Sequence, residues 1–340
     1  MSLPEFNYLS PPDLKAVCDL LREFKGQIAL CAGGTELVMH LKHRLKSPGY
    51  LLSLKNLPDL KTLRFDPEAG LILGAMCALK DLSADTRVKS RWTALAQGAE
   101  QVASPQVRNR ATIGGNVCLD TRCWYYNRSK QWRSTFPVCF KARGDQCHVV
   151  KGGRQCYALF QADTVPGLMI LKAKLKIVHS DGERMIPVEA FYSGLGETPN
   201  LLSDQEVLTE IHVPPLPPRS GTSYVKYKQR SVLEFPLLGV ASRVTLDGEG
   251  KYCREAGFGI IGHSSKPLLI EAGETLNGLD EPVLTDDILE HLLREVKPVK
   301  HMGVTASLKR RMARVFVQNA FSEAWKQARS QRADIIQEES

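Results

Sequence analysis

The sequence lacks any long apolar run and any strong excess of charge of one sign. No stretch approaches the roughly 18 consecutive apolar residues that a membrane-spanning helix needs, so we expect no membrane partner. The first residues lack a basic segment followed by a long apolar one, which predicts no targeting signal and a cytoplasmic location. The 45 Lys and Arg residues exceed the 37 Asp and Glu residues by 8, with both signs interspersed. This charge does not indicate nucleic acid binding, and it suits an acidic protein partner or an anionic cofactor equally well.

Motifs of several enzyme classes are missing as well. The eight histidines show no H-E-x-x-H spacing, and the G-x-S-x-G motif of many hydrolases does not occur. The sequence also has no Gly-Lys-Ser/Thr run of the kind found in P-loops. The residues therefore give no support to a hydrolase.

Length and composition fit a globular protein of more than one domain. The 340 residues are 43% hydrophobic and 24% charged, which excludes a disordered chain and allows two or three domains. Helical and strand patterns are mixed from the start, beginning with a helix predicted after its capping residue Asp13. Residues 79–102 show a helical pattern, and a hairpin is predicted around Asp181 and Gly182. Residues 212–221, HVPPLPPRSG, contain four prolines and predict a stiff linker. Beyond the linker, the patterns predict an antiparallel sheet followed by helices.

Two Gly-Gly loops are candidates for binding a phosphate. Residues 32–36, AGGTE, lie between a predicted strand and a predicted helix, where the glycine N–H groups can form an anion-binding nest. A tight turn without a ligand is an equally good interpretation of this loop alone. Residues 111–116, ATIGGN, offer a second glycine pair with hydroxyl and amide neighbours. Together, the loops favour a dinucleotide whose pyrophosphate is held from both sides.

Cysteine is frequent and unevenly distributed. Nine is an odd number, so complete pairing within the chain is impossible, and five of the nine fall between positions 118 and 156. A local cluster in a chain of this size favours metal binding over a disulfide scaffold. The surrounding block, residues 117–158, has no sustained periodicity and is too long for an ordinary loop. The candidate ligands of an iron–sulfur cluster or a structural zinc ion are Cys123, Cys139, Cys147 and Cys156.

The spacing of these four cysteines does not decide between the two kinds of metal site. It matches neither the C-x2-C pairs of zinc ribbons nor the C-x2-C-x2-C run of bacterial ferredoxins. Cys118 is a competing ligand, and thiols that merely occur in a loop are the alternative interpretation.

Taken together, the motifs resemble those of the FAD-binding medium subunits of the molybdenum hydroxylases. The segments AGGTEL and ATIGGN, a later D-x-x-P and a K-Q-R strand occur here in the order found in that family, and the similarity extends over about residues 4–325. The cysteine block, with its flanks TRCWYYN, GDQCHV and RQCYA, resembles the β subunits of 4-hydroxybenzoyl-CoA reductases. In those subunits, four such cysteines hold a [4Fe–4S] cluster.

The resemblance implies an α+β fold of several parts. We expect a two-subdomain FAD-binding module of the PCMH type, followed by a C-terminal α+β domain like that of CO dehydrogenase flavoproteins. The subdomains would span residues 1–56 and 57–213, with the cluster insertion at about 118–158 in the second. The C-terminal domain would span residues 214–330, before a polar tail at 331–340.

The resemblance also implies which residues bind cofactors. Val102 is expected near the flavin ring, Asp163 at the adenosine or ribityl portion, and Leu208 and Lys228 at the flavin. Glu36 keeps the charge of the Asp that is common in relatives but has a longer arm. The four cysteines Cys123, Cys139, Cys147 and Cys156 would be the cluster ligands. The two loops would hold the pyrophosphate through Leu30, Cys31, Ala32, Gly33, Gly34, Thr35, Glu36, Leu37, Thr112, Ile113, Gly114, Gly115 and Asn116.

The implied role is electron transfer within a larger complex. A large partner subunit would carry molybdopterin and the substrate, and a small one two [2Fe–2S] clusters, in a heterotrimer or an (αβγ)2 heterohexamer. Electrons from ferredoxin would pass through the [4Fe–4S] cluster, FAD and the [2Fe–2S] clusters to molybdenum. There, 4-hydroxybenzoyl-CoA would be reduced to benzoyl-CoA, with loss of water, in anaerobic degradation of aromatic compounds. No catalytic residue is expected in this chain, because the cofactors carry the chemistry.

Other interpretations stay open at this point. One is the FAD subunit of a hydroxylase like xanthine dehydrogenase or aldehyde oxidoreductase, which would pass electrons outward to an acceptor. Another is a zinc-stapled binding module, which would leave both glycine loops unexplained. The basic residues of the cysteine block could steer an acidic ferredoxin or could simply be solvated. These residues are Arg122, Arg128, Lys130, Arg133, Lys141, Arg143, Lys151 and Arg154.

Overall fold

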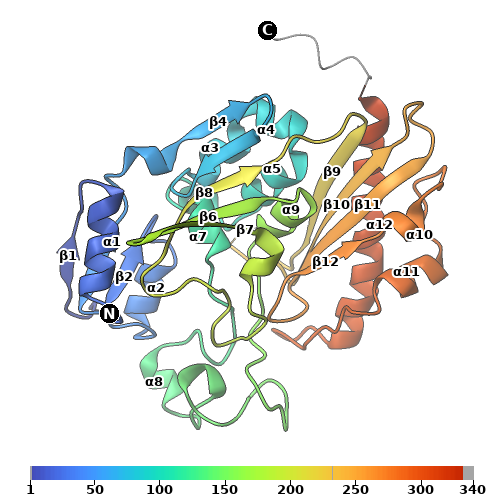
Figure 1. Cartoon of the computed structure of the whole chain (residues 1–340). Coiled ribbons are helices and arrows are strands. Elements are labelled where there is room, and N and C mark those ends of the chain that lie inside the picture. The colour runs from blue at the N-terminus through green and yellow to red at the C-terminus, as the bar shows by residue number, and fades with distance from the viewer. Residues whose placement is uncertain (1, 232, 332–340) are drawn as a thin grey trace.

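Three β-sheets organise the chain in the computed structural model, which describes residues 2–231 and 233–331 (Figure 1). The first sheet is parallel, with strand order β1-β3-β2. The Asp13 side chain caps the first helix by accepting from the N–H of Ala16 at 2.8 Å, which confirms the predicted helix start. The elements here are β1 (Asn7–Leu9), α1 (Leu14–Glu23), β2 (Ile28–Cys31), α2 (Leu37–Lys42) and β3 (Tyr50–Ser53).

The second sheet is antiparallel, with strand order β4-β5-β8-β6-β7. The predicted hairpin around Asp181 and Gly182 is confirmed, because β6 and β7 pair across this turn. The elements that form this sheet and pack beside it are η1 (Pro58–Lys61), β4 (Leu63–Asp66), β5 (Gly70–Gly74), α3 (Leu79–Ala84), α4 (Thr86–Arg91), α5 (Thr93–Glu100), α6 (Pro105–Arg108), α7 (Ile113–Val117), α9 (Val165–Ile170), β6 (Lys174–His179), β7 (Gly182–Pro187), η3 (Val188–Phe191) and β8 (Val207–Val213).

The helical pattern of residues 79–102 forms three short helices rather than one. Asp85 has an extended backbone, and its side chain accepts from the N–H groups of Arg87 and Val88, so it ends α3 and caps α4. Trp92 makes the second break, with a non-helical backbone between α4 and α5. Apolar residues of all three helices nevertheless belong to the main hydrophobic core.

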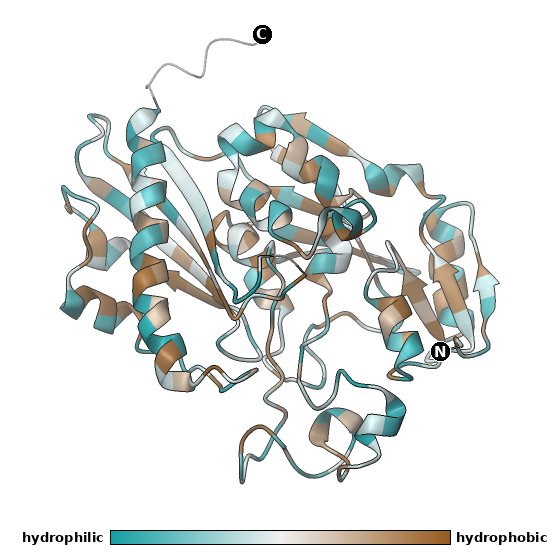
Figure 2. Ribbon diagram, turned by 180° about the vertical axis from the view of Figure 1, so that it is seen from behind, coloured by the Kyte–Doolittle hydropathy of each residue, from teal (hydrophilic) through white to brown (hydrophobic). Residues whose placement is uncertain are grey.

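The third sheet is antiparallel, with strand order β12-β11-β10-β9, and the long helix α12 packs along it. In Figure 2, teal and brown alternate along α12, as expected for a helix with one buried face. Gly221 allows this close packing, because a side chain there would collide with the backbone of α12. The elements are β9 (Ser220–Tyr227), β10 (Leu238–Leu246), β11 (Cys253–Ile261), β12 (Leu268–Glu271), α10 (Gly273–Leu276), α11 (Asp286–Leu292) and α12 (Ala306–Ser330).

Residues 120–158 form a separate lobe, called here the cysteine lobe, which hangs below the sheets in Figure 1. Its regular elements are only α8 (Lys130–Arg133) and η2 (Phe140–Ala142). Within the described part of the chain, none of its residues belongs to the three hydrophobic cores. A small aromatic group partly replaces a core, with the rings of Trp132 and Phe136 4.7 Å apart. This lobe therefore depends on contacts other than a buried apolar interior.

The sheets follow the order of the chain. Their strands come from residues 7–53, 63–213 and 220–271, and the proline-rich segment 214–219 lies between β8 and β9 without forming helix or strand. The division into domains at 56–57 and 213–214 stays a prediction. The polar tail predicted at 331–340 lies, apart from residue 331, outside the described residues. Among the helices described, none is long and apolar enough to cross a membrane.

Candidate functional site

The chain has three parts, each of which contains one of the three sheets. A cavity of about 450 Å³ lies where these three parts meet. Its walls come from residues 30–46 of the first part, 102–127 and 161–163 of the second, and 233–235 of the third. The size is in the range of small-molecule sites, which usually lie between about 300 and 1,000 Å³. The cavity is therefore the first candidate for the cofactor site.

The two glycine loops lie against each other at this cavity. A side chain at Gly33 would collide with the carbonyl group of Arg110, so the first loop can approach the second only with glycine there. Gly34 has a φ of 74°, a conformation that favours glycine. On the second loop, the hydroxyl of Thr112 accepts from the N–H of Gly115 at 3.1 Å and fixes the turn. Both predicted loops thus belong to one site.

The first loop also offers unused hydrogen-bond donors. No hydrogen bond within residues 2–231 and 233–331 uses the backbone N–H groups of Gly33, Gly34 or Thr35. Successive N–H groups in such a loop form a concave site for an anion. These donors fit the pyrophosphate of a dinucleotide, which is the group predicted from the sequence.

Most of the predicted FAD contacts line the cavity. They include the flanking residues of both loops as well as two positions outside the loops. The predicted residues that line it are Leu30, Ala32, Gly33, Gly34, Thr35, Glu36, Leu37, Val102, Thr112, Gly115, Asn116 and Asp163.

The other five predicted contacts lie outside the cavity lining: Cys31, Ile113, Gly114, Leu208 and Lys228. Ile113 is fully buried in the main core, and Leu208 belongs to strand β8. Gly114 lies against Ala75, where an added side chain would come within 2.6 Å of the Ala75 side chain. A cofactor contact of these five residues stays a prediction.

Asp163 is held by protein groups at the wall of the cavity. Its Oδ1 accepts from the Tyr224 hydroxyl at 2.7 Å, and its Oδ2 accepts from the Lys226 ammonium at 3.0 Å. All three side chains are buried. Burial raises the pKa of Asp163 to about 6, although the charge of Lys226 and both hydrogen bonds act in the opposite direction.

Sequence reasoning missed Tyr224 and Lys226, and the flavin contact of Lys228 stays a prediction. Side chains alternate along a strand, so Tyr224, Lys226 and Lys228 would share one face if the strand continued. Strand β9 ends at Tyr227, and Lys228 lies beyond it and is half-buried. The alternation could have found the right face, but only the end of the strand identifies the buried lysine.

Glu36 makes two charged contacts in the cavity wall. Its Oε1 contacts the Arg122 guanidinium, and Nε2 of His40 lies 2.8 Å from the same oxygen. Burial alone would raise the pKa of Glu36, but His40 and Arg122 outweigh it, so the pKa is lowered. Asn116 links the second loop to the turn of Asp163, because its Oδ1 accepts from the Thr164 hydroxyl at 2.7 Å.

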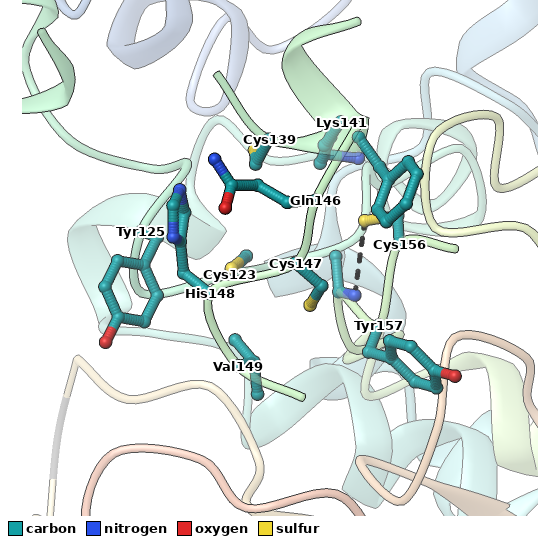
Figure 3. Close-up of a pocket in the computed structure, with 12 residues that line it drawn as sticks. Cys123, Tyr125, Cys139, Lys141, Gln146, Cys147, His148, Val149, Cys156 and Tyr157 are labelled. Atoms are coloured by element: carbon teal, nitrogen blue, oxygen red, sulfur yellow. Dashed lines mark hydrogen bonds between the residues drawn. The ribbon is translucent and has the colours of Figure 1, made fainter. Parts of the chain in front are cut away.

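The four candidate metal ligands, Cys123, Cys139, Cys147 and Cys156, line one small pocket in the cysteine lobe (Figure 3). All four are free thiols. Among the residues that the structure describes, no three His, Cys, Asp or Glu side chains gather closely enough to bind one metal ion. The lobe thus brings the predicted ligands to a common pocket without forming a single-ion site.

Backbone N–H groups donate to sulfur atoms around this pocket. The N–H of Val150 lies 3.4 Å from Sγ of Cys147, and the N–H of Ala158 lies 3.4 Å from Sγ of Cys156. Burial raises the pKa of Cys156 to about 12, and burial followed by neighbouring thiols raises that of Cys123. Metal coordination would be needed to hold such buried thiols as thiolates.

Lys141 links the start of the cysteine lobe to Gly196, which lies outside the lobe. Its buried ammonium donates to Oδ1 of Asp120 at 2.8 Å, to the Thr121 hydroxyl at 2.6 Å and to the Gly196 carbonyl at 2.6 Å. The same side chain lines the cysteine pocket, where its charge lowers the pKa of Cys156 against the larger effect of burial. One lysine therefore both fixes the lobe and supplies positive charge beside the sulfur atoms.

Three of the eight basic residues predicted as a docking surface are engaged inside the protein, which corrects that prediction. Lys141 is buried, and Arg122 contacts Glu36. Arg133 donates to the backbone carbonyl of Arg44 at 3.0 Å. A docking surface would have to rely on the remaining five: Arg128, which stacks over Trp124 at 3.5 Å, and Lys130, Arg143, Lys151 and Arg154, which are exposed.

Comparison with solved structures shows the fold. Carbon monoxide dehydrogenase from Hydrogenophaga pseudoflava, in a form lacking the Mo-pyranopterin moiety, contains a chain that matches with a TM-score of 0.76 and 24% identity. The match covers 96% of this chain and 99% of the other. Quinoline 2-oxidoreductase from Pseudomonas putida 86 contains a chain that matches with a TM-score of 0.75 and 21% identity, covering 97% and 100%. The predicted α+β class is confirmed.

Comparison with curated proteins and families gives the same result at the level of sequence. The aldehyde oxidoreductase FAD-binding subunit PaoB of Escherichia coli (strain K12) is 30% identical over 253 residues, which are 72% of this chain and 77% of the relative. The xanthine dehydrogenase FAD-binding subunit of Escherichia coli O157:H7 is 24% identical over 301 residues, covering 88% and 89%. Residues 4–216 match the family described as "FAD binding domain in molybdopterin dehydrogenase". With both glycine loops of the cavity inside this matched region, the chain belongs to the family of FAD-binding domains of molybdopterin dehydrogenases.

Proposed function

We propose that this chain is the FAD-bearing electron-transfer subunit of a molybdenum hydroxylase-type complex, and that its cysteine lobe holds a [4Fe–4S] cluster. The observation that carries the second part is the convergence of Cys123, Cys139, Cys147 and Cys156 on one pocket. The lobe has no hydrophobic core among its described residues, and a metal cluster would supply the organising centre that a core otherwise provides.

The pocket favours a cluster over a single zinc ion. A cubane cluster is bound at four separate iron corners, so its ligands stand farther apart than the four ligands of one tetrahedral ion. The absence of a single-ion arrangement among the described side chains fits this requirement. Hydrogen bonds from N–H groups to cysteine sulfur, as at Cys147 and Cys156, are a recognised means of adjusting cluster potential.

The cavity supports the position proposed for FAD. When bound, FAD accepts and returns electrons, and this chain supplies binding and electrostatics. The free amides of Gly33, Gly34 and Thr35 would bind the pyrophosphate. Asn116 and Asp163 would keep the opposite wall of the cavity in position. They would do so through hydrogen bonds to protein groups and not as free charges.

For the whole complex, we propose the arrangement of 4-hydroxybenzoyl-CoA reductase. A ferredoxin would donate electrons to the cysteine lobe, and large and small partner subunits would carry molybdopterin and [2Fe–2S] clusters, as an (αβγ)2 heterohexamer. The likeness of the cysteine segment and the exposed cations of the lobe support this proposal. Nine free cysteines fit a reducing cytoplasm.

A hydroxylase that passes electrons outward is a second candidate. The names of the curated relatives favour it, since they are FAD-binding subunits of an aldehyde oxidoreductase and a xanthine dehydrogenase. The assay that separates the two uses the purified complex. Reduced ferredoxin with 4-hydroxybenzoyl-CoA should yield benzoyl-CoA in the first case, whereas xanthine or an aldehyde should reduce an added acceptor in the second.

The cluster is tested by metal and flavin analysis of a cysteine variant. Cys147→Ser should lower the iron content by about four per chain while the protein still binds FAD at saturating FAD concentration, because the two cavities are separate. The control is Cys18→Ala, which changes a buried thiol in the core of the first part and should keep all the iron. Full iron content in Cys147→Ser would refute the ligand set. Zinc in place of iron would favour the zinc-stapled module.

A further inference from the structure

One arginine links the cysteine lobe to the FAD cavity. Arg122 directly precedes Cys123, and its guanidinium leaves the lobe to contact Oε1 of Glu36 in the first glycine loop. Both side chains are largely covered, with exposed fractions of 20% for Arg122 and 27% for Glu36. The contact joins residues that are 86 positions apart in the chain.

Arg122 is held in place from other sides. Its backbone pairs with Leu159, donating to the Leu159 carbonyl at 2.7 Å and accepting from the Leu159 N–H at 2.8 Å. Its guanidinium also lies over the ring of Phe235, 4.5 Å from the ring centre. An arginine fixed in this way loses little conformational freedom when it binds a carboxylate, so its contact with Glu36 retains more of its strength than a mobile surface pair.

Glu36 is equally constrained on the cavity side. Nε2 of His40 lies 2.8 Å from the oxygen that Arg122 contacts, and Glu36, His40, Arg122 and Phe235 all line the FAD cavity. Because the pKa of Glu36 is lowered, its carboxylate is ionised at neutral pH and the pair carries full charge. The loop that offers its amides to the pyrophosphate is therefore tied to the residue beside Cys123.

The length of the Glu36 side chain is what allows this contact. An Asp at the same position would withdraw the carboxylate by about 1.5 Å, the length of one carbon–carbon bond. The contact with Arg122 would then be lost unless one of the two segments moved. This reach gives a structural reason for glutamate, rather than aspartate, at position 36.

We propose that Glu36 and Arg122 form a latch that couples the two sites, so that filling the FAD cavity favours the metal-loaded form of the cysteine pocket and the reverse. FAD would further restrain the loop of Glu36, and a metal centre would further restrain Cys123 beside Arg122. The latch stabilises the state in which both segments are ordered. Coupling between two sites is reciprocal, and it typically changes affinities about 5- to 150-fold. Both residues act as positioning residues. The inference rests on the proposed function for the metal in the pocket.

The test compares FAD affinity with and without the metal centre in the full-length chain. The chain is stripped of FAD and of iron, reloaded with iron and sulfide in one arm, and titrated with FAD by fluorescence quenching. In the wild type, iron loading should tighten FAD binding on the order of 10-fold. The measured ratio is the FAD dissociation constant without iron divided by that with iron. In Glu36→Gln and Arg122→Gln this ratio should fall to about 1, and the double variant should match either single variant.

Conservative variants separate reach from charge. Glu36→Asp keeps the charge but shortens the arm, so it should lose the coupling as Glu36→Gln does. Arg122→Lys keeps the charge and should retain part of the coupling. The matched control is Arg154→Gln, which removes an exposed charge from the same lobe and should keep the full ratio. A ratio near 1 in the wild type, or an unchanged ratio in Glu36→Gln and Arg122→Gln, would overturn the latch.

A second readout keeps the latch testable if the cluster proposal fails. If neither the wild type nor any variant takes up iron, FAD is used as the ligand. The measurement is then protease cleavage of the cysteine lobe. FAD should slow cleavage within residues 120–158 about 5-fold or more in the wild type and in Arg154→Gln, but not in Arg122→Gln. Equal protection in all three proteins would refute the latch independently of any metal.

Discussion

Lys226 offers the sharpest test of how the FAD cavity is built. We expect Lys226→Met to destabilise the fold, because it leaves the Asp163 carboxylate buried without its charged partner. The exposed fractions of these side chains are only 1% for Lys226 and 4% for Asp163, so solvent cannot replace the lost interaction. Lys226 also donates to the Gln101 carbonyl at 2.8 Å, and that acceptor loses its partner too.

The magnitude follows from opposing contributions. At 3.0 Å, the attraction between the two charges is about 5–6 kcal/mol with an effective dielectric constant of about 20. Burial more than offsets it, since the pKa of Asp163 is about 6 instead of 3.8 even with Lys226 in place, a net penalty of about 3 kcal/mol for the ionised form. The intact pair therefore contributes little net stability, but removal of one partner from a buried pair typically costs about 3–5 kcal/mol. We expect a loss of that size in the free energy of unfolding at pH 7.

The loss should depend on pH in a defined direction. A carboxyl whose pKa is raised on folding favours the folded state at low pH, and this contribution disappears as pH rises through the folded pKa. Without Lys226, the pKa of Asp163 should rise further, so the variant protonates Asp163 at a higher pH than the wild type does. Below about pH 6 both proteins protonate it. The destabilisation should thus be smaller at pH 5 than at pH 7.

Urea denaturation at the two pH values measures these differences. The matched control is Lys174→Met, which removes an exposed strand lysine outside the cavity lining and should change stability by no more than about 0.5 kcal/mol. The same samples give the FAD content, which should fall for Lys226→Met and stay for Lys174→Met. A loss below about 1 kcal/mol at pH 7, or a loss independent of pH, would refute the reasoning.

Two further predictions concern a glycine and a histidine. Gly33→Ala should weaken FAD binding at least about 10-fold and lower the free energy of unfolding by about 1–3 kcal/mol, because its side chain would collide with the Arg110 carbonyl. The control Gly273→Ala adds a side chain in open space and should leave FAD titrations unchanged. Burial, with a smaller effect of a nearby lysine, lowers the pKa of His263 to about 4, so the wild type should lose about 3 kcal/mol as pH falls from 6.5 to 4. His263→Gln should remove that part of the pH dependence in urea denaturation, and the exposed His291→Gln should not; equal curves for wild type and His263→Gln would contradict the assignment.

Features encoded by neighbouring residues could be predicted from the sequence. The cap at Asp13, the hairpin at Gly182 and the breaks at the glycine loops depend on backbone preferences of a few consecutive residues. The long helical pattern of residues 79–102 was less informative, because apolar periodicity survives the breaks that divide it into α3, α4 and α5.

Contacts between distant segments could not be predicted in this way. The sequence did not single out Lys226, which is buried on strand β9 beside Asp163. It also offered eight cations as a possible docking surface, although Arg122, Arg133 and Lys141 are engaged within the protein. Burial and ion pairing depend on what packs against a residue, and that partner can lie anywhere in the chain.

By itself, the sequence determined that this protein has two glycine loops able to approach an anion and a cysteine-rich block without a core of its own, because glycine conformation and residue composition are local properties. Only the tertiary structure decided that both loops face one cavity, that four cysteines separated by up to 33 positions share one pocket, and that Arg122 joins the two through Glu36. These arrangements depend on how three sheets and one coreless lobe pack together, and no local pattern encodes that packing.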